Sequence, residues 1–245
     1  MTVSLVRLSR LFILGLSLSL LSTSVLAEVN NLDPWEPMNR KIDGFTNGVD
    51  RYFLVPVAKS YQYLMPAPAS AGVTNFIANT FEVNSMLNSA LQAKPKNLGL
   101  SFSRFMINLS LGFFGLFDVA TELGVHANKE DFGQTFAHWG VPQGPYVVLP
   151  FLGPSSVRQG LGLYPDILVN PVITDNVRLR NSLFALFFVD TRAELLSAET
   201  LISGDRYVFL RNAFLQNRQF LINDGVVADD FGEEAGEDDW LNDDF

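Results

Sequence analysis

The segment from residue 97 to residue 109 has the periodicity of an α-helix, but with the usual proportions of polar and hydrophobic surface reversed. Placed on a helix at about 100° per residue, Asn97, Ser101, Arg104 and Asn108 fall within about 60° of arc. Hydrophobic side chains occupy most of the remaining surface, whereas a soluble surface helix has a limited apolar stripe. The pattern indicates either lipid or protein outside and a polar passage inside, or a core helix whose arginine pairs with a buried acid.

Helix start and stop signals dominate the rest of the chain. Asp33, Pro34 and Glu36 have the arrangement of a capping box, with an N-cap acid, a proline at the first helical position and a glutamate at the third. Prolines, glycines and the Asn-Asp-Gly run at 223–225 mark further boundaries. The sequence therefore predicts one all-α domain with helices at 34–53, 56–63, 71–80, 83–92, 95–109, 115–123, 128–139, 155–160, 174–189, 191–198 and 205–222.

The largest irregular segment is 140–154, which contains four prolines and three glycines. It is also rich in hydrophobic residues, and loops this apolar rarely face water. We expect it to pack inside the fold or to enter an apolar environment. Residues 146–149 could form one short strand pair, but nothing in the sequence suggests a larger sheet.

The first 27 residues are typical of a secretory signal peptide. Arg7 and Arg10 precede an apolar run at 11–21, and small residues follow at 25–27. The run is shorter than the roughly 20 apolar residues of a comfortable transmembrane helix, although an uncleaved anchor stays an alternative. No later segment is predicted to span a membrane. The chain is nevertheless 48% hydrophobic with 21 phenylalanines, which favours a protein lying in a membrane rather than crossing it.

Charge divides the remaining chain into a domain, 28–227, and a tail, 228–245. The formal net charge is −9, and the tail contains nine acidic residues and no basic residue. We expect a solvated, disordered tail that serves solubility or offers Trp240, Leu241 and Phe245 as a short docking patch. No basic stripe is present to neutralise phosphates, so the sequence does not indicate nucleic-acid binding.

Motifs for catalysis or cofactor binding are lacking in the sequence. There is no G-x-S-x-G nucleophile elbow, no H-E-x-x-H zinc motif, no phosphate loop and no G-x-G-x-x-G fingerprint. The two histidines, His126 and His138, have no cysteine with which to form a metal site. We therefore predict a protein that is not an enzyme and that has neither a metal nor a cofactor.

The predicted last helix, like the segment at 97–109, has arginine among hydrophobic residues. Arg211 and Arg218 fall within the face formed by its aromatic and aliphatic residues. An unpaired buried charge costs several kcal/mol, so these arginines need partners, and Asp190 and Glu194 are the candidates for structural ion pairs. The alternative is a guanidinium that meets a lipid phosphate or lines a polar conduit, because its planar fork suits phosphate.

Several stretches together resemble the MlaA (VacJ-type) proteins of the Gram-negative outer membrane. The resemblance extends over nearly all of 33–225, and the F-G-Q-T…W-G-V…G-P-Y-V-V-L-P-F-x-G-P string is its most specific part. The stretches are DPWEPMNRKIDGF (33–45), VPVAKSYQYLMPAPASAGVTNFIANTFEVNSMLN (55–88), SRFMINLSLGFFGLFDVA (103–120), EDFGQTFAHWGVPQGPYVVLPFLGPSSVRQGLG (130–162) and DTRAELL…SGDRYVFLRNAFLQNRQFLINDG (190–225).

The resemblance implies a compact, ring-like helical domain that lies in the inner leaflet of the outer membrane, at its periplasmic face, beside trimeric porins. A central amphipathic channel would admit phospholipids that have strayed to the outer leaflet and pass them to a soluble periplasmic carrier. Candidate lipid-path residues are Asn97, Ser101, Arg104, Asn108, Arg211 and Arg218. Candidate membrane-facing residues are Phe102, Phe105, Met106, Phe113, Phe114 and Phe117. The candidate hinge or hairpin residues are Gly140, Pro142, Gly144, Pro145, Tyr146, Pro150, Phe151, Gly153 and Pro154.

One feature departs from the family pattern. Familiar members are acylated on an N-terminal cysteine, and this chain contains no cysteine. Anchoring is then expected from apolar helices and a porin partner, or from an uncut leader, since one acyl chain alone gives only marginal membrane binding. A lipid-binding or porin-binding scaffold without transport is the alternative function, and an esterase is a third hypothesis, weakened by the missing nucleophile elbow.

Overall fold

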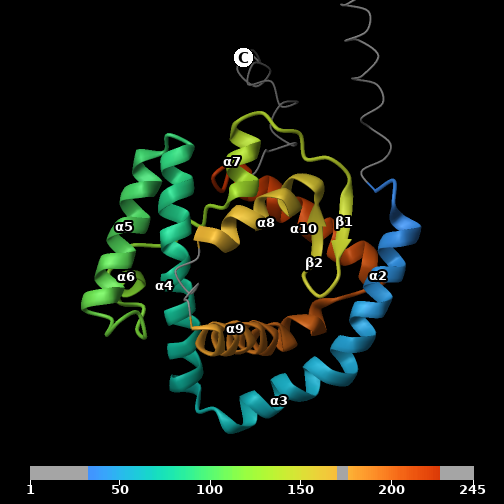
Figure 1. Ribbon diagram of the computed structural model, residues 1–245, viewed down its shortest axis with the longest axis horizontal. Helices are drawn as coiled ribbons and strands as arrows, with labels where there is room; N and C mark the ends of the chain where they lie inside the picture. Colours follow the sequence, from blue (N-terminus) through green and yellow to red (C-terminus); the bar gives the residue numbers. More distant parts are fainter. Residues whose placement is uncertain (1–32, 170–175, 227–245) are drawn as a thin grey trace, which may run out of the picture.

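The helices form a ring around a central opening (Figure 1). The structure is a computed structural model, and it describes residues 33–169 and 176–226. Helices account for most of these residues, and the described strands form a single two-stranded sheet, so the all-α expectation is confirmed. The expected leader, 1–27, and the expected acidic tail, 228–245, lie outside the described residues.

One side of the ring is a curved, uninterrupted helical arc. It consists of α2 (Glu36–Val49), the π-helical turn η1 (Asp50–Leu54) and α3 (Val55–Leu64). The sequence predicts a break before Pro56, and this is wrong because the π turn carries the chain across it. The Val55 N–H bonds to the Asp50 carbonyl, and Pro56 then stands at the start of α3, where a missing N–H costs nothing.

The opposite side of the ring is an antiparallel pair of helices, α4 (Ala67–Leu91) and α5 (Pro95–Ser110), with α5 on the outside (Figure 1). The sequence predicts two helices at 71–80 and 83–92, whereas α4 is one continuous helix. A tight reversal joins the pair, with Ala93 in the left-handed region at φ 54° and the Lys94 N–H bonded to the Ser89 carbonyl. The predicted helix at 95–109 matches α5 closely.

Shorter elements follow α5. They are α6 (Val119–Glu122), α7 (Phe132–His138) and the hairpin of β1 (Tyr146–Leu149) and β2 (Gly153–Ser156), in which Tyr146 pairs with Ser156. The predicted strand pair is thus confirmed. The predicted helix at 115–123 shrinks to α6 because Phe113, Phe114 and Gly115 all have positive φ.

The last helices complete the fold. They are α8 (Val157–Val169), α9 (Val177–Ala198), the 3₁₀ turn η2 (Glu199–Leu201) and α10 (Arg206–Ile222). The α8 helix extends well past the predicted end at 160 despite an internal proline, and α9 is one helix where two were predicted. The α10 helix begins as predicted, with the Asp205 carboxylate accepting hydrogen bonds from two N–H groups of its first turn.

The ring closes where α2 meets α10 and β1. Asn39 is fully buried and takes the place of a strand partner, because its amide donates to the Tyr146 carbonyl and accepts from the Val148 N–H. Asp33 accepts hydrogen bonds from Asn39, Tyr207 and Arg211. The predicted capping box is therefore wrong: α2 begins at Glu36 without a side-chain cap, and the Asp33 carboxylate serves tertiary contacts instead.

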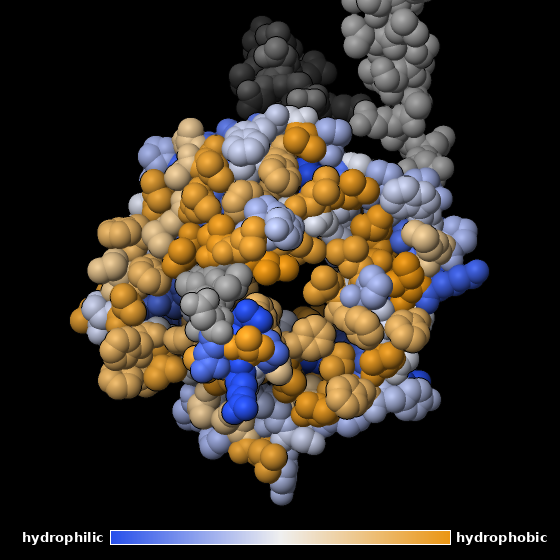
Figure 2. All heavy atoms as spheres, in the orientation of Figure 1, coloured by the Kyte–Doolittle hydropathy of each residue, from blue (hydrophilic) through white to orange (hydrophobic). Residues whose placement is uncertain are grey.

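The usual distribution, with hydrophobic residues buried and polar residues exposed, is reversed in this ring. Among the described residues, the buried set is mostly polar, and its few hydrophobic members include Ala58, Ala120, Tyr146 and Tyr207. Large hydrophobic side chains are instead widely exposed, and Figure 2 shows them spread over the face that surrounds the opening. A water-facing protein rarely exposes so much contiguous apolar surface. None of the described helices is both long enough and apolar enough to cross a bilayer.

Replacing Gly162 by alanine should destabilise the ring by about 1–3 kcal/mol, as overpacking does in a tight core. A Cβ at this position would lie 2.6 Å from the backbone nitrogen of Gly133, so α8 would have to move away from α7. Gly160→Ala on the same helix is the matched control, because its Cβ would meet open space and alanine favours a helix. Thermal unfolding followed by circular dichroism measures both, and equal melting temperatures would contradict the close approach.

Candidate functional site: a two-chambered passage through the ring

An apolar chamber of about 720 Å³ opens inside the ring. Helix α4 supplies one wall through Val73, Phe76 and neighbouring residues, and α9 supplies another through its segment from Leu183 to Phe188. Leu116, the hairpin residue Leu152 and the α8 residues Leu163, Asp166 and Ile167 complete the lining. The volume lies in the range of about 300–1,000 Å³ that is typical of small-molecule sites, and the walls suit hydrocarbon.

A second, polar chamber of about 490 Å³ adjoins the first. Its walls come from α4, α7, α8 and α9, with Leu221 of α10 at one side. Its polar and charged lining residues are Thr74, Asn84, Ser85, Lys129, Glu130, Asp131, Gln134, Gln159, Asp166, Asp190, Thr191 and Glu194. The chamber therefore has more polar and acidic residues than its neighbour, although apolar atoms still form most of its exposed lining.

The two chambers share five lining residues, Ile77, Phe81, Leu163, Asp166 and Phe187, and we call this shared boundary the neck. Figure 2 shows the molecule hollowed near its centre. An amphiphile with apolar chains and a polar headgroup matches this succession of surfaces. The neck thus separates a chamber with hydrocarbon-like walls from one that contains more polar groups.

Arg104, a predicted lipid-path residue, lies in a buried ion-pair network between α4 and α5. Its Nε donates to Glu82 at 2.7 Å, and one terminal nitrogen lies 3.1 and 3.2 Å from the two Asp118 oxygens. The other terminal nitrogen donates to Thr121 and to the Val125 carbonyl. Arg104 is 4% exposed and every nitrogen of its guanidinium has a partner, so none is left for a lipid.

Arg211 and Arg218 are also engaged by acids, though not by the predicted ones. Arg211 lies 3.2 Å from Asp33, and Arg218 makes a bidentate pair with Asp131 at 2.7 and 2.9 Å. Burial opposes ionisation of Asp131, but the hydrogen bonds and charge of Arg218 outweigh it and hold the pKa of that carboxyl below its ordinary value. The predicted partners were wrong, because Asp190 instead accepts hydrogen bonds from the hydroxyl groups of Tyr61 and Thr74, and Glu194 accepts from Thr74.

The remaining lipid-path candidates also serve the structure. Ser101 and Asn108 are buried against α4, and Asn108 connects the Asp118 carboxylate to the Ala120 N–H. Asn97 donates to Glu130 and Asp224. None of the six candidates lines either of these two chambers, and their place on the lipid path stays a prediction. The polar stripe of α5 thus meets Glu82 of α4 through Arg104, and it meets Asp118, Ala120, Glu130 and Asp224 through its other bonds.

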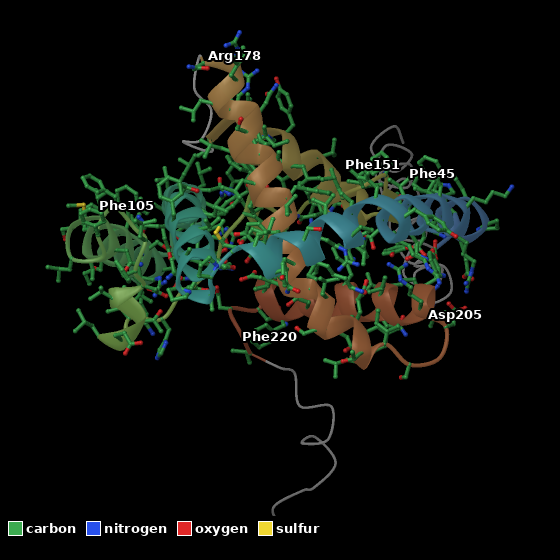
Figure 3. All side chains as sticks on the ribbon, turned by 90° about the horizontal axis from the view of Figure 1, so that it is seen from below. Phe45, Phe105, Phe151, Arg178, Asp205 and Phe220 are labelled. Carbon is green, nitrogen blue, oxygen red and sulfur yellow. The ribbon has the colours of Figure 1, made fainter. Side chains whose placement is uncertain are left out.

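The hinge candidates form the β-hairpin and the loop that leads into it. Gly140, Gly144 and Gly153 adopt positive φ values that glycine tolerates best. Tyr146 is 1% exposed and packs edge-on against Tyr207, which fixes the base of the hairpin. At the tip, Phe151 lies beside Phe45 of α2 (Figure 3). The next residue, Leu152, lines the apolar chamber, so the hairpin connects the ring wall to the passage.

The membrane-facing candidates lie on the outer side of α5 and in the turn that follows it. Phe102, Met106, Phe113, Phe114 and Phe117 are all exposed, and Phe105 is half-buried at the outer edge of the ring (Figure 3). Their exposure in a chain without a covering partner agrees with a surface that meets lipid or protein. On the same view, the N-terminal part of α9 rises out of the ring, with Arg178 near its tip.

Sequence reasoning missed the residues of the neck. Ile77, Phe81, Leu163 and Phe187 lie in ordinary amphipathic helices, and nothing in their spacing distinguishes them from core positions. Asp166 could have been recognised from the sequence, because an acid directly after Pro165 interrupts the apolar end of α8. Its position opposite α4 depends on the crossing of helices distant in sequence, which periodicity does not reveal.

Comparisons with known proteins agree with this geometry. The family model described as MlaA lipoprotein matches residues 31–221. The chain is 34% identical over 201 residues to the intermembrane phospholipid transport system lipoprotein MlaA of Escherichia coli (strain K12), with 80% of each chain covered. It is 33% identical over 205 residues to the protein of the same name from Haemophilus influenzae, covering 80% of this chain and 82% of that one.

A solved structure is similar as well. The chain described under "Structural basis for maintenance of bacterial outer membrane lipid asymmetry" superposes with a TM-score of 0.69 and 34% sequence identity. The match covers 78% of this chain and 99% of the solved one. Sequence and fold therefore give the same family relationship.

Proposed function

The chain belongs to the MlaA lipoprotein family, and we propose that it conducts phospholipids through its ring to maintain the lipid asymmetry of the outer membrane. The observation that supports this proposal is an apolar chamber that shares the neck residues with a more polar one. Acyl chains would move along the apolar walls while the headgroup follows the polar ones. No covalent step is assigned, and phospholipid moves down its own gradient or is drawn off by an acceptor.

The exposed surface of the ring supports a proposal for its placement in the membrane. Exposed phenylalanines on the outer side of α5 would contact acyl chains of the inner leaflet, with the ring lying in the plane of that leaflet at the periplasmic face. Part of the same surface would contact a trimeric porin, and a soluble periplasmic carrier would receive the lipid. The proposed organisation is a leader at 1–27, a ring domain at 28–227 and a solvated acidic tail at 228–245.

The alternative function is a scaffold that binds lipid or a porin without moving lipid. A scaffold would also use the exposed aromatic surface for binding, but it assigns no role to the two chambers. The two functions differ in one measurable quantity, the rate at which phospholipid crosses from one leaflet to an acceptor outside the other.

Vesicle extraction tests the proposal directly. The full chain is reconstituted into phospholipid vesicles that contain a short-chain fluorescent phospholipid in both leaflets, and albumin is added outside as a soluble acceptor. We expect lipid from the inner leaflet to become extractable faster than in vesicles without protein. A scaffold would bind lipid yet leave this rate at the protein-free value, and that result would overturn the conduit.

A further inference from the structure

The neck carries one acidic side chain at the boundary between the chambers. Asp166 of α8 is the one charged residue among the described residues that line the apolar chamber, and it lines the polar chamber too. Every phospholipid headgroup that crosses the neck would pass this carboxylate. A charge at such a constriction in an apolar wall interacts with a ligand more strongly than it would in water.

The Asp166 carboxylate is held in place but not neutralised. Its Oδ1 accepts hydrogen bonds from the Asn84 amide at 2.8 Å and from the Phe132 N–H at 3.1 Å. No hydrogen bond to Oδ2 is found among the described residues, and no arginine, lysine or histidine of that set lies within ion-pair distance. The nearby Arg218 is engaged in its bidentate pair with Asp131.

The Asp166 carboxyl lies in a partly desolvated environment. Burial raises the pKa of Asp166, and the negative charge of Asp131 contributes to the same effect. The carboxylate is therefore less well solvated than one on an open surface, and a cationic ligand group would relieve that deficit.

The acids beyond the neck divide into paired and unpaired groups. Glu130 pairs with Lys94, and Asp131 pairs with Arg218. Asp190 is 2% exposed and lines the polar chamber, yet its hydrogen-bond donors are the hydroxyl groups of Tyr61 and Thr74 rather than a cation. Glu194 likewise accepts from Thr74. The excess negative charge thus continues from the neck into the polar chamber.

We propose that Asp166 makes the passage selective for phospholipids whose headgroup carries an ammonium group, such as phosphatidylethanolamine, over phospholipids whose headgroup has no positive charge. This inference rests on the proposed conduit function and names its preferred substrate class. The ammonium donates a charge-assisted hydrogen bond to Oδ2 of Asp166 while the acyl chains occupy the apolar chamber. Asp190 and Glu194 then offer the ammonium a second acidic position beyond the neck.

The test compares two lipids in the vesicle extraction assay. Phosphatidylethanolamine and phosphatidylglycerol carry the same fluorescent acyl chain, and their extraction rates are measured with the full chain present. We expect phosphatidylethanolamine to be extracted about tenfold faster, and Asp166→Asn to remove that preference, as expected for one charge-assisted hydrogen bond. Asp166→Glu should keep the preference in part, because it keeps the charge.

The matched control is Glu122→Gln, which removes one negative charge from an exposed residue of α6 outside both chambers. It should leave the ratio of the two rates unchanged. A variant of the lipid tests the same point without altering the protein: N-acetylated phosphatidylethanolamine lacks the positive charge and should be extracted as slowly as phosphatidylglycerol. This comparison holds even where Asp166→Asn does not fold.

The outcomes separate the two proposals. If neither lipid is extracted faster than in protein-free vesicles, the conduit itself is wrong. If both lipids are extracted faster but at equal rates, or if Asp166→Asn keeps the full preference, the conduit stands and the selectivity of Asp166 is overturned. If Glu122→Gln abolishes the preference as strongly as Asp166→Asn, net charge rather than the neck controls selection, and the proposal is likewise overturned.

Discussion

Arg104→Ala should lower the free energy of unfolding by about 3–5 kcal/mol, which is the cost of breaking a buried ion pair by removing one partner. Arg104 and Glu82 are 4% and 6% exposed, and Nε of Arg104 lies 2.7 Å from the Glu82 carboxylate. Without the guanidinium, Glu82 stays between α4 and α5 with no cation to balance it. Denaturant unfolding in mild detergent, followed by circular dichroism, measures the loss.

Two further variants test whether the broken ion pair is the cause of the lost stability. Arg51→Ala removes an exposed arginine from the arc and should change stability by less than about 0.5 kcal/mol. The double variant Arg104→Met/Glu82→Gln removes both charges and should recover much of the stability. If Arg104→Ala instead folded with wild-type stability and slowed lipid extraction alone, the arginine would belong to the passage after all.

Leu163→Trp should reduce phospholipid extraction by more than about tenfold while leaving the ring folded. Leu163 lines both chambers, so an indole ring at this position would occupy the neck that every lipid must cross. Overpacking at this position should cost about 1–3 kcal/mol of stability, so the ring should stay folded while the path is blocked. The vesicle assay with albumin as acceptor gives the rate, and circular dichroism confirms the fold.

Leu161→Trp is the matched control for the blocked neck. It lies on the same helix two residues away, it is 61% exposed, and it lines neither chamber. The same substitution at this position should leave the extraction rate near that of the wild type. Equal rates for the two tryptophan variants would show that lipid takes another route.

The sequence was sufficient to predict the helical class, the limits of α5 and the short strand pair at 146–149. These features depend on local periodicity and on prolines and glycines, which act over a few residues. Local signals also misled in places: Pro56 marks no break because a π turn accommodates it, and the capping signature at Asp33 gives way to tertiary hydrogen bonds.

The candidate site was harder to predict for a physical reason. The periodicity of 97–109 showed correctly that four polar residues share one face, but it could not show what that face meets. In the structure it meets Glu82 and Asp118 rather than a lipid. The chamber walls are assembled from α4, α8 and α9, and only the crossing of these helices brings Ile77, Leu163 and Phe187 together.

The contacts between α2 and α10 that close the ring have a consequence for biogenesis. Tyr207 bonds to Asp33 across 174 residues of sequence, and Arg206 pairs with Asp43 nearby. A chain truncated before α10 would lose these contacts and keep the bonds of Asn39 to β1, so we expect a ring that closes less tightly.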